Sequence, residues 1–151
     1  MKKVLVIISI FSFFTTFAQI VKPAVLKYTS SNAAPKVGQT VDLVFEATID
    51  PKWKLYSTEN TIDPGPFATQ LSVAASPNYK LIGKLKSIKP QSHFDDIWEA
   101  KVSYFTGTAK FVQQVKILKP KTIIEGKIEF QTCTIKDGSC VMNKEKFKFS
   151  F

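Results

Sequence analysis

The clearest structural signal in this chain is the segment Val41-Asp42-Leu43-Val44-Phe45-Glu46-Ala47-Thr48-Ile49. Leu43, Phe45, Ala47 and Ile49 fall on one side of an extended backbone, and the polar side chains fall mostly on the other. An apolar period of two residues is typical of a β-strand with one buried face. The segment therefore predicts a half-buried strand over residues 41–49.

The same alternation recurs along the chain, and no segment has the apolar period of an amphipathic helix. Further strands are expected over residues 24–29, 53–57, 67–75, 79–88, 100–105, 109–118, 126–132 and 146–151. Turn-forming residues separate these runs at intervals of about ten residues, as in Asp63-Pro64-Gly65-Pro66 and Asp137-Gly138. About eight or nine short strands with this spacing predict an all-β domain, an immunoglobulin-like β-sandwich of two sheets.

The first eighteen residues have the composition of a secretory signal peptide. Lys2 and Lys3 precede an uncharged apolar run, and small residues lead up to Ala18. The apolar run is shorter than the roughly 20 residues that a membrane-spanning helix needs. We therefore expect cleavage after Ala18, export to the periplasm or the medium, and one domain over residues 19–151 with no transmembrane segment.

Charge and composition narrow the classes of function. The chain carries a net charge of +9, but its basic residues are spread along the sequence instead of forming a stripe with interleaved aromatics. This pattern does not favour a nucleic-acid-binding protein. One histidine, His93, and two cysteines cannot complete a four-ligand zinc site without a carboxylate, so no metal and no cofactor is expected.

The two cysteines, Cys133 and Cys140, lie close together in a stretch that predicts strand, tight turn and strand. Asp137-Gly138 supplies a turn that can bring the two sulfurs together across a hairpin. A disulfide that closes a loop of eight residues stabilises a fold by only about 2.5 kcal/mol. Two interpretations stand: a structural disulfide, or an accessible pair that exchanges with another protein's thiolate.

Four segments together resemble a known family. They are Asp50-Pro51-Lys52-Trp53-Lys54-Leu55-Tyr56-Ser57, Asp63-Pro64-Gly65-Pro66, Asp95-Asp96-Ile97-Trp98-Glu99-Ala100-Lys101-Val102-Ser103-Tyr104-Phe105, and the hairpin from Cys133 to Cys140. In order and spacing they are similar to the amino-terminal periplasmic domain of the DsbD thiol:disulfide interchange reductases, over essentially the whole mature chain. The resemblance implies an immunoglobulin-like domain that takes electrons from a membrane-embedded thiol reductase and passes them to thioredoxin-like periplasmic proteins.

The resemblance also implies roles for individual residues. Cys133 and Cys140 would be the redox pair, with Cys140 the sulfur that a partner attacks. Trp98, preceded by Asp95 and Asp96, would cap the disulfide. Tyr56 would line the same site. Each of these flanking residues also has an ordinary interpretation, because Trp98 and Tyr56 could be core aromatics and the two aspartates could be loop charges.

Two functions of different classes therefore remain open at the level of sequence. The first is an electron relay, a component of a protein-disulfide reductase. The second is a non-catalytic binding module of the envelope, whose hairpin disulfide is structural. Reduction potential separates the two, because a structural disulfide lies below about −300 mV and does not equilibrate with a thioredoxin-like protein.

Overall fold

The computed structural model describes residues 22–96 and 98–151. The signal segment expected over residues 1–18 lies outside these residues. Within them, no helix is long and apolar enough to span a membrane. The described chain is built from β-strands, as the alternating pattern indicates.

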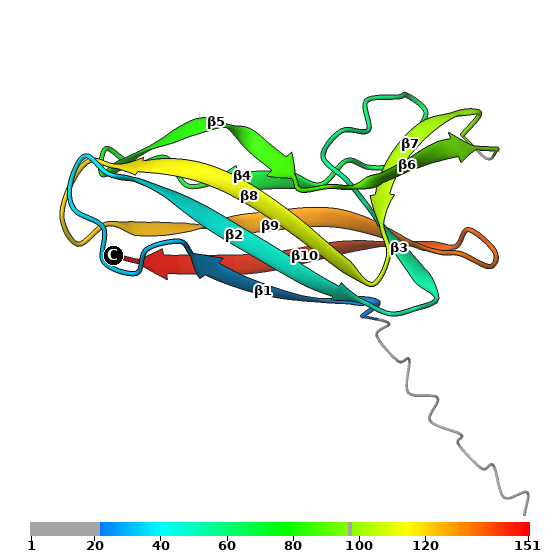
Figure 1. Cartoon of the computed structure of the whole chain (residues 1–151), viewed down its shortest axis with the longest axis horizontal. Helices are drawn as coiled ribbons and strands as arrows, with labels where there is room; N and C mark the ends of the chain where they lie inside the picture. Colours follow the sequence, from blue (N-terminus) through cyan, green and yellow to red (C-terminus); the bar gives the residue numbers. More distant parts are fainter. Residues whose placement is uncertain (1–21, 97) are drawn as a thin grey trace, which may run out of the picture.

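Ten strands make up the described fold, and two antiparallel sheets hold them (Figure 1). The strands are β1 (Ala24–Ser30), β2 (Thr40–Ile49), β3 (Trp53–Tyr56), β4 (Gln70–Val73), β5 (Tyr79–Ser87), β6 (Gln91–Asp95), β7 (Ala100–Phe105), β8 (Thr108–Ile117), β9 (Ile123–Thr134) and β10 (Cys140–Ser150). One sheet has the order β1-β2-β8-β5. The other has the order β10-β9-β3-β7-β6, and β4 pairs with β9 beside β3.

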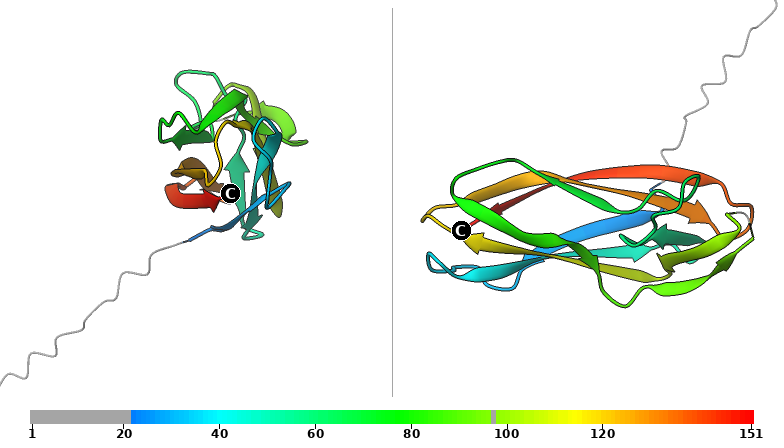
Figure 2. Two further views of the ribbon diagram at one scale, coloured as in Figure 1. Left: turned by 90° about the vertical axis from the view of Figure 1, so that its left-hand side faces the viewer. Right: turned by 90° about the horizontal axis from the view of Figure 1, so that it is seen from above.

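The two sheets form the layers of a sandwich, and the main core lies between them (Figure 2). Phe45 of β2 and Phe111 of β8 are fully buried from one sheet, and Phe130 of β9 from the other. Phe147 of β10 packs edge-on against Phe45, with ring centroids 5.0 Å apart. The alternation along residues 41–49 places Val41, Leu43, Phe45, Ala47 and Ile49 in this core, which confirms the predicted β-sandwich.

The strand bounds differ from the sequence expectation in three places. The strand β6 has no counterpart among the expected ones, because four of its five residues are exposed on an edge strand and leave no apolar period. The expected strand over 67–75 is shortened to β4. The last two strands are longer than expected, because β9 and β10 pair without interruption from Cys133 and Cys140 to Ile123 and Ser150. The total is thus ten strands instead of eight or nine.

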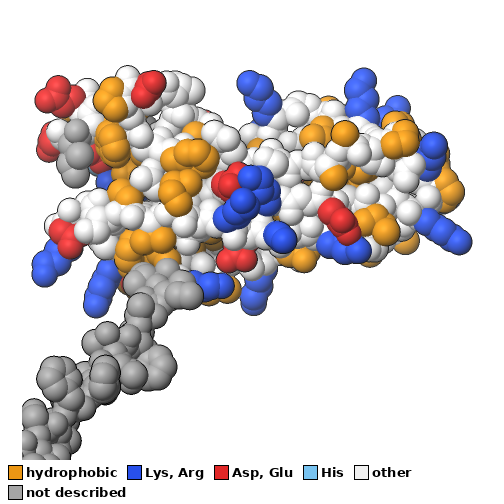
Figure 3. Space-filling model, turned by 180° about the vertical axis from the view of Figure 1, so that it is seen from behind, with side chains coloured by type: hydrophobic (Ala, Val, Ile, Leu, Met, Phe, Trp, Pro, Cys, Tyr) orange, Lys and Arg blue, Asp and Glu red, His pale blue; other side chains and the backbone are white. Residues whose placement is uncertain are grey.

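The chain carries more lysine than acidic side chains. In Figure 3 the lysine side chains stand apart from one another over the face in view. Several are paired with carboxylates, such as Lys148 with Glu125 at 2.7 Å and Lys127 with Glu129 at 2.8 Å. Pairing of this kind weakens the attraction of these lysines for anionic ligands.

Candidate functional site

Cys133 and Cys140 face each other at the turn end of the β9–β10 hairpin and form a disulfide, with 4.1 Å between their Cα atoms. The backbone N–H of Thr134 donates to the carbonyl of Ser139 at 2.9 Å, so the cysteines occupy the neighbouring position of the ladder, where side chains approach most closely. Their exposure differs sharply. Cys140 is exposed on the edge strand, whereas Cys133 is 1% exposed.

The turn after Thr134 is held by its own polar groups. The Asp137 carboxylate accepts hydrogen bonds from the Thr134 hydroxyl and from the Ser139 backbone N–H. These hydrogen bonds, that from Thr134 first, lower the pKa of Asp137. Gly138 has a φ of 70°, a conformation that glycine adopts without steric cost. Asp137-Gly138 therefore makes the turn that the sequence indicated, and the ionised carboxylate stabilises it.

The disulfide lies on the outer face of the six-stranded sheet, opposite the main core. Leu55 of β3 belongs to the main core, and side chains alternate along a strand, so Lys54 and Tyr56 point to the other face. Lys54 is the cross-strand partner of Cys133, and Tyr56 that of Tyr104 on β7. Strand register alone therefore gathers Cys133, Lys54, Tyr56 and Tyr104 on one surface.

A second, small apolar cluster covers this surface. Its buried members are Tyr56, Val102 and Cys133, and Ile62 and Trp98 pack against them. Two chain segments contribute the cover: the connection between β3 and β4, which carries Ile62, and the turn between β6 and β7, which carries Trp98. The indole N–H of Trp98 donates to the Tyr56 hydroxyl at 3.4 Å. The structure thus brings Trp98 and Tyr56 together in the cluster that contains Cys133.

The connection that carries Ile62 is fixed to the sheet by polar contacts. The Asn60 side chain donates to the Ser103 carbonyl and accepts from the Ser103 N–H, both at 2.8 Å. The Thr69 hydroxyl donates to the Tyr56 carbonyl at 2.6 Å. This part of the cover is therefore anchored to β7 and β3 by buried hydrogen bonds, which are costly to leave unmade.

A buried ion pair lies beside the cluster. Lys54 Nζ is 2.9 Å from Asp95 Oδ2, with the two side chains only 13% and 5% exposed. The ammonium also lies 5.4 Å from the ring centroid of Tyr56 and 5.8 Å from that of Tyr104. His93 approaches the same carboxylate oxygen at 3.9 Å. The family resemblance implies a role for Asp95 but none for Lys54, whose partner is 41 residues away and leaves no local signal in the sequence.

The environment of Lys54 favours its charged form. Burial by itself lowers the pKa of Lys54, but the hydrogen bonds to Asp95 and Tyr56 and the attraction to these groups outweigh burial and raise the pKa above 10.5. The lysine is therefore an ammonium ion throughout the pH range in which thiols react.

The two aspartates of the sequence motif lie in different environments. Asp95 ends β6, is buried and accepts the backbone N–H of Trp98 at 3.4 Å on Oδ1. Asp96, the next residue, is exposed at the start of the turn. Asp95 therefore belongs to the architecture of the site, whereas Asp96 lies at its rim.

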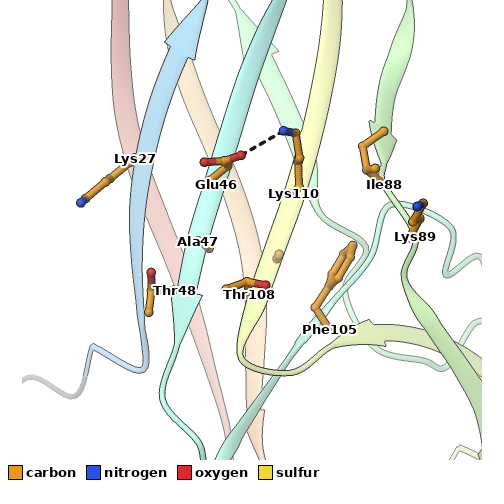
Figure 4. A pocket seen from close by; sticks show the side chains of 10 residues that line it. Lys27, Glu46, Ala47, Thr48, Ile88, Lys89, Phe105, Thr108 and Lys110 are labelled. Carbon is orange, nitrogen blue, oxygen red and sulfur yellow. Dashed lines mark ion pairs between the residues drawn. The ribbon is translucent and has the colours of Figure 1, made fainter.

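A hollow of about 580 Å³ lies elsewhere, on the four-stranded sheet (Figure 4). Lys27, Glu46 and Lys110 line it from neighbouring strands, and the Lys110–Glu46 pair, at 3.0 Å, is solvent-exposed. It contains neither cysteine and no buried polar group, so we do not regard it as the reactive site. Within residues 22–96 and 98–151, no group of three His, Cys, Asp or Glu side chains could hold a metal ion.

The geometry suits thiol–disulfide exchange. Cys140 is the exposed cysteine that an attacking thiolate can meet, whereas Cys133 lies in the aromatic cluster and would be the sulfur that leaves.

Comparison with solved structures reveals similar folds. The N-terminal periplasmic domain of ScsB from Proteus mirabilis matches with a TM-score of 0.59 and 13% identity, over 85% of this chain and 47% of that one, so the chain spans about half of it. The reduced DsbD n-terminal domain of Neisseria meningitidis matches with a TM-score of 0.53 and 13% identity, over 82% and 84%. The complex of the DsbD and PilB N-terminal domains from Neisseria meningitidis matches with a TM-score of 0.54 and 10% sequence identity, over 89% of this chain and 93% of the matched chain.

Comparison of sequences gives the family. No curated protein sequence matches the chain. The sequence pattern of the family described as "Thiol:disulfide interchange protein DsbD, N-terminal" matches residues 22–150, which is nearly everything the structure describes. The chain therefore belongs to the family of DsbD N-terminal domains.

Proposed function

We propose that this domain is a periplasmic electron carrier that exchanges electrons with thioredoxin-like proteins through Cys133 and Cys140. The observation that carries the proposal is the unequal exposure of the two bonded cysteines, of which Cys140 is exposed and Cys133 is buried. The family and the fold shared with a DsbD domain that was solved in complex with PilB support it.

The exchange proceeds in two displacements. In the reduced domain, the Cys140 thiolate attacks a sulfur of the partner's disulfide, a mixed disulfide forms, and the partner's second sulfur leaves as a thiolate. The Cys133 thiolate then attacks Cys140 Sγ, which releases the partner as a dithiol and restores the Cys133–Cys140 bond. Two electrons pass to the partner. A membrane-embedded thiol reductase reverses both steps and reloads the domain.

Trp98 acts in this proposal as the cap. Its ring packs on the cluster that includes Cys133, and it is carried by a turn that belongs to none of the core strands. A partner that displaces the turn would uncover Cys133, the sulfur that must leave when Cys140 is attacked, so exchange with the turn in place would be slower. Tyr56 belongs to the cluster against which the indole packs, and its hydroxyl accepts the indole N–H.

The test is trapping with single-cysteine variants. Cys133→Ser leaves the exposed Cys140. Its thiolate should displace thionitrobenzoate from a thioredoxin-like protein that lacks its resolving cysteine and whose remaining cysteine carries this group in a disulfide, so that the protein–protein mixed disulfide accumulates. Cys140→Ser leaves only the buried sulfur and is the matched control, in which little adduct should form. Equal trapping by both variants, or by neither, would contradict the assignment of Cys140 as the attacked sulfur.

A non-catalytic binding module is the second candidate. An apolar groove beside the hairpin turn favours it, lined by Pro51, Trp53 and Ile135, of which Ile135 is 58% exposed. Exposed apolar surface of this kind is typical of protein contacts. In this case the reduction potential would lie below about −300 mV, and a Cys133→Ser/Cys140→Ser variant would keep its partner.

We also infer that residues 1–18 direct export and are removed, which would place the domain in the periplasm. Mass spectrometry of the protein recovered from the envelope tests this inference. A mature chain that begins at Gln19 is expected, and an intact Met1 would overturn it.

A further inference from the structure

The Lys54–Asp95 ion pair is unusual because its charges are almost fully withdrawn from water. Removing two charges from water costs several kcal/mol per ion, and a buried ion pair seldom stabilises a fold more than apolar side chains of similar size. The pair therefore calls for an explanation other than stability. Its position offers one, since the lysine begins beside Cys133 and its ammonium ends next to the Trp98 turn.

Strand register alone would keep Lys54 and Asp95 apart. Tyr104 of β7 pairs with Tyr56 on one side and with Gln91 on the other. Tyr56, Tyr104 and Gln91 thus form one cross-strand row. Lys54 lies two residues before this row on β3, and Asp95 lies four residues after it on β6, which runs in the same direction. In a flat sheet, these six residues would separate Lys54 and Asp95 by about 20 Å along the strands. A lysine side chain spans about a third of that distance. The contact therefore exists only because the β6–β7 hairpin coils back over the outer face of the sheet.

The contact fixes the part of the hairpin that carries Trp98. One oxygen of the Asp95 carboxylate receives the Lys54 ammonium, and the other receives the backbone N–H of Trp98. The indole of Trp98 then reaches the Tyr56 hydroxyl. A continuous chain of polar contacts thus runs from β3, through Asp95, to the turn and back to β3.

We propose that Lys54 is a positioning residue that latches the Trp98 turn onto the outer face beside Cys133 and so sets how readily the disulfide reacts. The inference rests on the proposed function, because it concerns the same pair of sulfurs. Lys54 takes no part in the exchange itself. It holds Asp95, and Asp95 holds the turn.

The two residues are suited to a latch that can open. Cation and carboxylate attract each other strongly while they are dry, and each is well solvated once water enters. A docking partner that lifts the turn would therefore release both side chains to water without breaking the main core, to which neither belongs. Tyr56 and Tyr104 flank the ammonium and keep water from the closed pair.

The experiment measures access to the disulfide with dithiothreitol as the probe. All proteins carry Trp53→Phe, which leaves Trp98 as the only tryptophan of the two in the chain. Lys54→Met keeps the length of the side chain and removes its charge. Lys110→Met is the matched control, because it breaks a lysine–carboxylate pair of similar length that is exposed on the other sheet. Lys54→Arg tests whether a different cation restores the latch.

Lys54→Met should be reduced at least roughly tenfold faster than the parent, since loss of one partner from a buried pair shifts the closed turn toward its open form. Trp98 emission should move to longer wavelength as the indole meets water. Lys110→Met should leave the rate and the emission unchanged, and Lys54→Arg should fall between the parent and Lys54→Met.

A further variant separates the latch from misfolding. If Lys54→Met alone fails to fold because it removes the ammonium beside the buried Asp95 carboxylate, the double variant Lys54→Met/Asp95→Asn removes the negative charge as well and is measured instead. Parent-like rates and emission in the folded variants would overturn the latch. Dithiothreitol needs no protein partner, so the latch can be confirmed even if the domain does not exchange electrons with a thioredoxin-like protein. Equally, the domain can exchange electrons with such a protein even if the variants overturn the latch.

Discussion

Reduction of the Cys133–Cys140 disulfide is expected to leave the domain folded and to lower its free energy of unfolding by about 2.5 kcal/mol. The figure follows from the eight residues that the bond encloses, through the chain entropy that the bond removes from the unfolded state. The fold should survive, because the β9–β10 ladder continues for ten further register pairs beyond the cysteines and the disulfide lies outside the main core.

The same free energy fixes a difference in reduction potential by linkage. A bond that stabilises the folded state by about 2.5 kcal/mol forms more readily there than in the unfolded chain by the same amount, which for two electrons is about 50 mV. This is a modest shift. It leaves the bond within reach of thioredoxin-like proteins, unlike a disulfide that the fold holds closed by many kcal/mol.

Urea unfolding of the oxidised and the dithiothreitol-reduced protein measures the difference directly. With a slope of about 1–3 kcal/mol per molar urea, the midpoint should fall by about 0.8–2.5 M on reduction. The same transition should be seen by circular dichroism and by tryptophan emission. A loss above about 5 kcal/mol, or a reduced protein that is already unfolded in buffer, would show that the bond is structural and would refute the reasoning.

Three further perturbations have defined outcomes. Trp98→Ala should speed alkylation of the reduced protein by iodoacetamide several-fold with little change in melting temperature; parent-like alkylation with a large loss of stability would instead assign Trp98 to the core. Gly126→Ala should lower the melting temperature strongly, because the new methyl group would lie 2.2 Å from the Ser72 carbonyl and force β4 away from β9; a parent-like melting curve would contradict the close approach. The stabilisation from Lys54 should be complete below pH 10.5 and lost as pH rises through its higher folded pKa. Because burial also raises the pKa of Tyr79, which titrates with the same sign, the test is whether Lys54→Met shows a shallower alkaline loss of stability than the parent.

The features that the sequence predicts correctly are those specified by neighbouring residues, such as the buried face of a strand or a turn. The period of two along residues 41–49 reports burial of one strand face, and β2 buries the expected side chains there. Asp137-Gly138 predicts a turn because both residues have strong turn preferences, and the hairpin turns there. The same reasoning missed β6, since an exposed edge strand needs no apolar alternation and is specified by its partner β7 instead.

The surroundings of the disulfide could be foreseen only in part. The resemblance pointed to Tyr56, Asp95 and Trp98, and the structure brings these three together. It did not point to Lys54, which reads in the sequence as an ordinary polar position of a short strand. Its burial depends on the coiling of the β6–β7 hairpin, a tertiary feature that is determined by the packing of segments about 40 residues apart.

The two faces of the six-stranded sheet carry separate apolar clusters. This separation explains how Cys133 can be covered by a turn that opens while the rest of the fold stays intact. The inner face carries the core that holds the fold together, a buried cluster that includes Phe130 of this sheet and Phe45 of the other. The outer face carries a separate, small cluster whose cover is made of a hairpin turn and a connection. Lifting the turn exposes little apolar surface compared with unfolding the sandwich, so local opening at the disulfide can occur at a free energy well below that of global unfolding. A cysteine pair inside the main core could be reached only by global unfolding. A pair on the surface without a covering turn would react at a rate that no part of the fold controls.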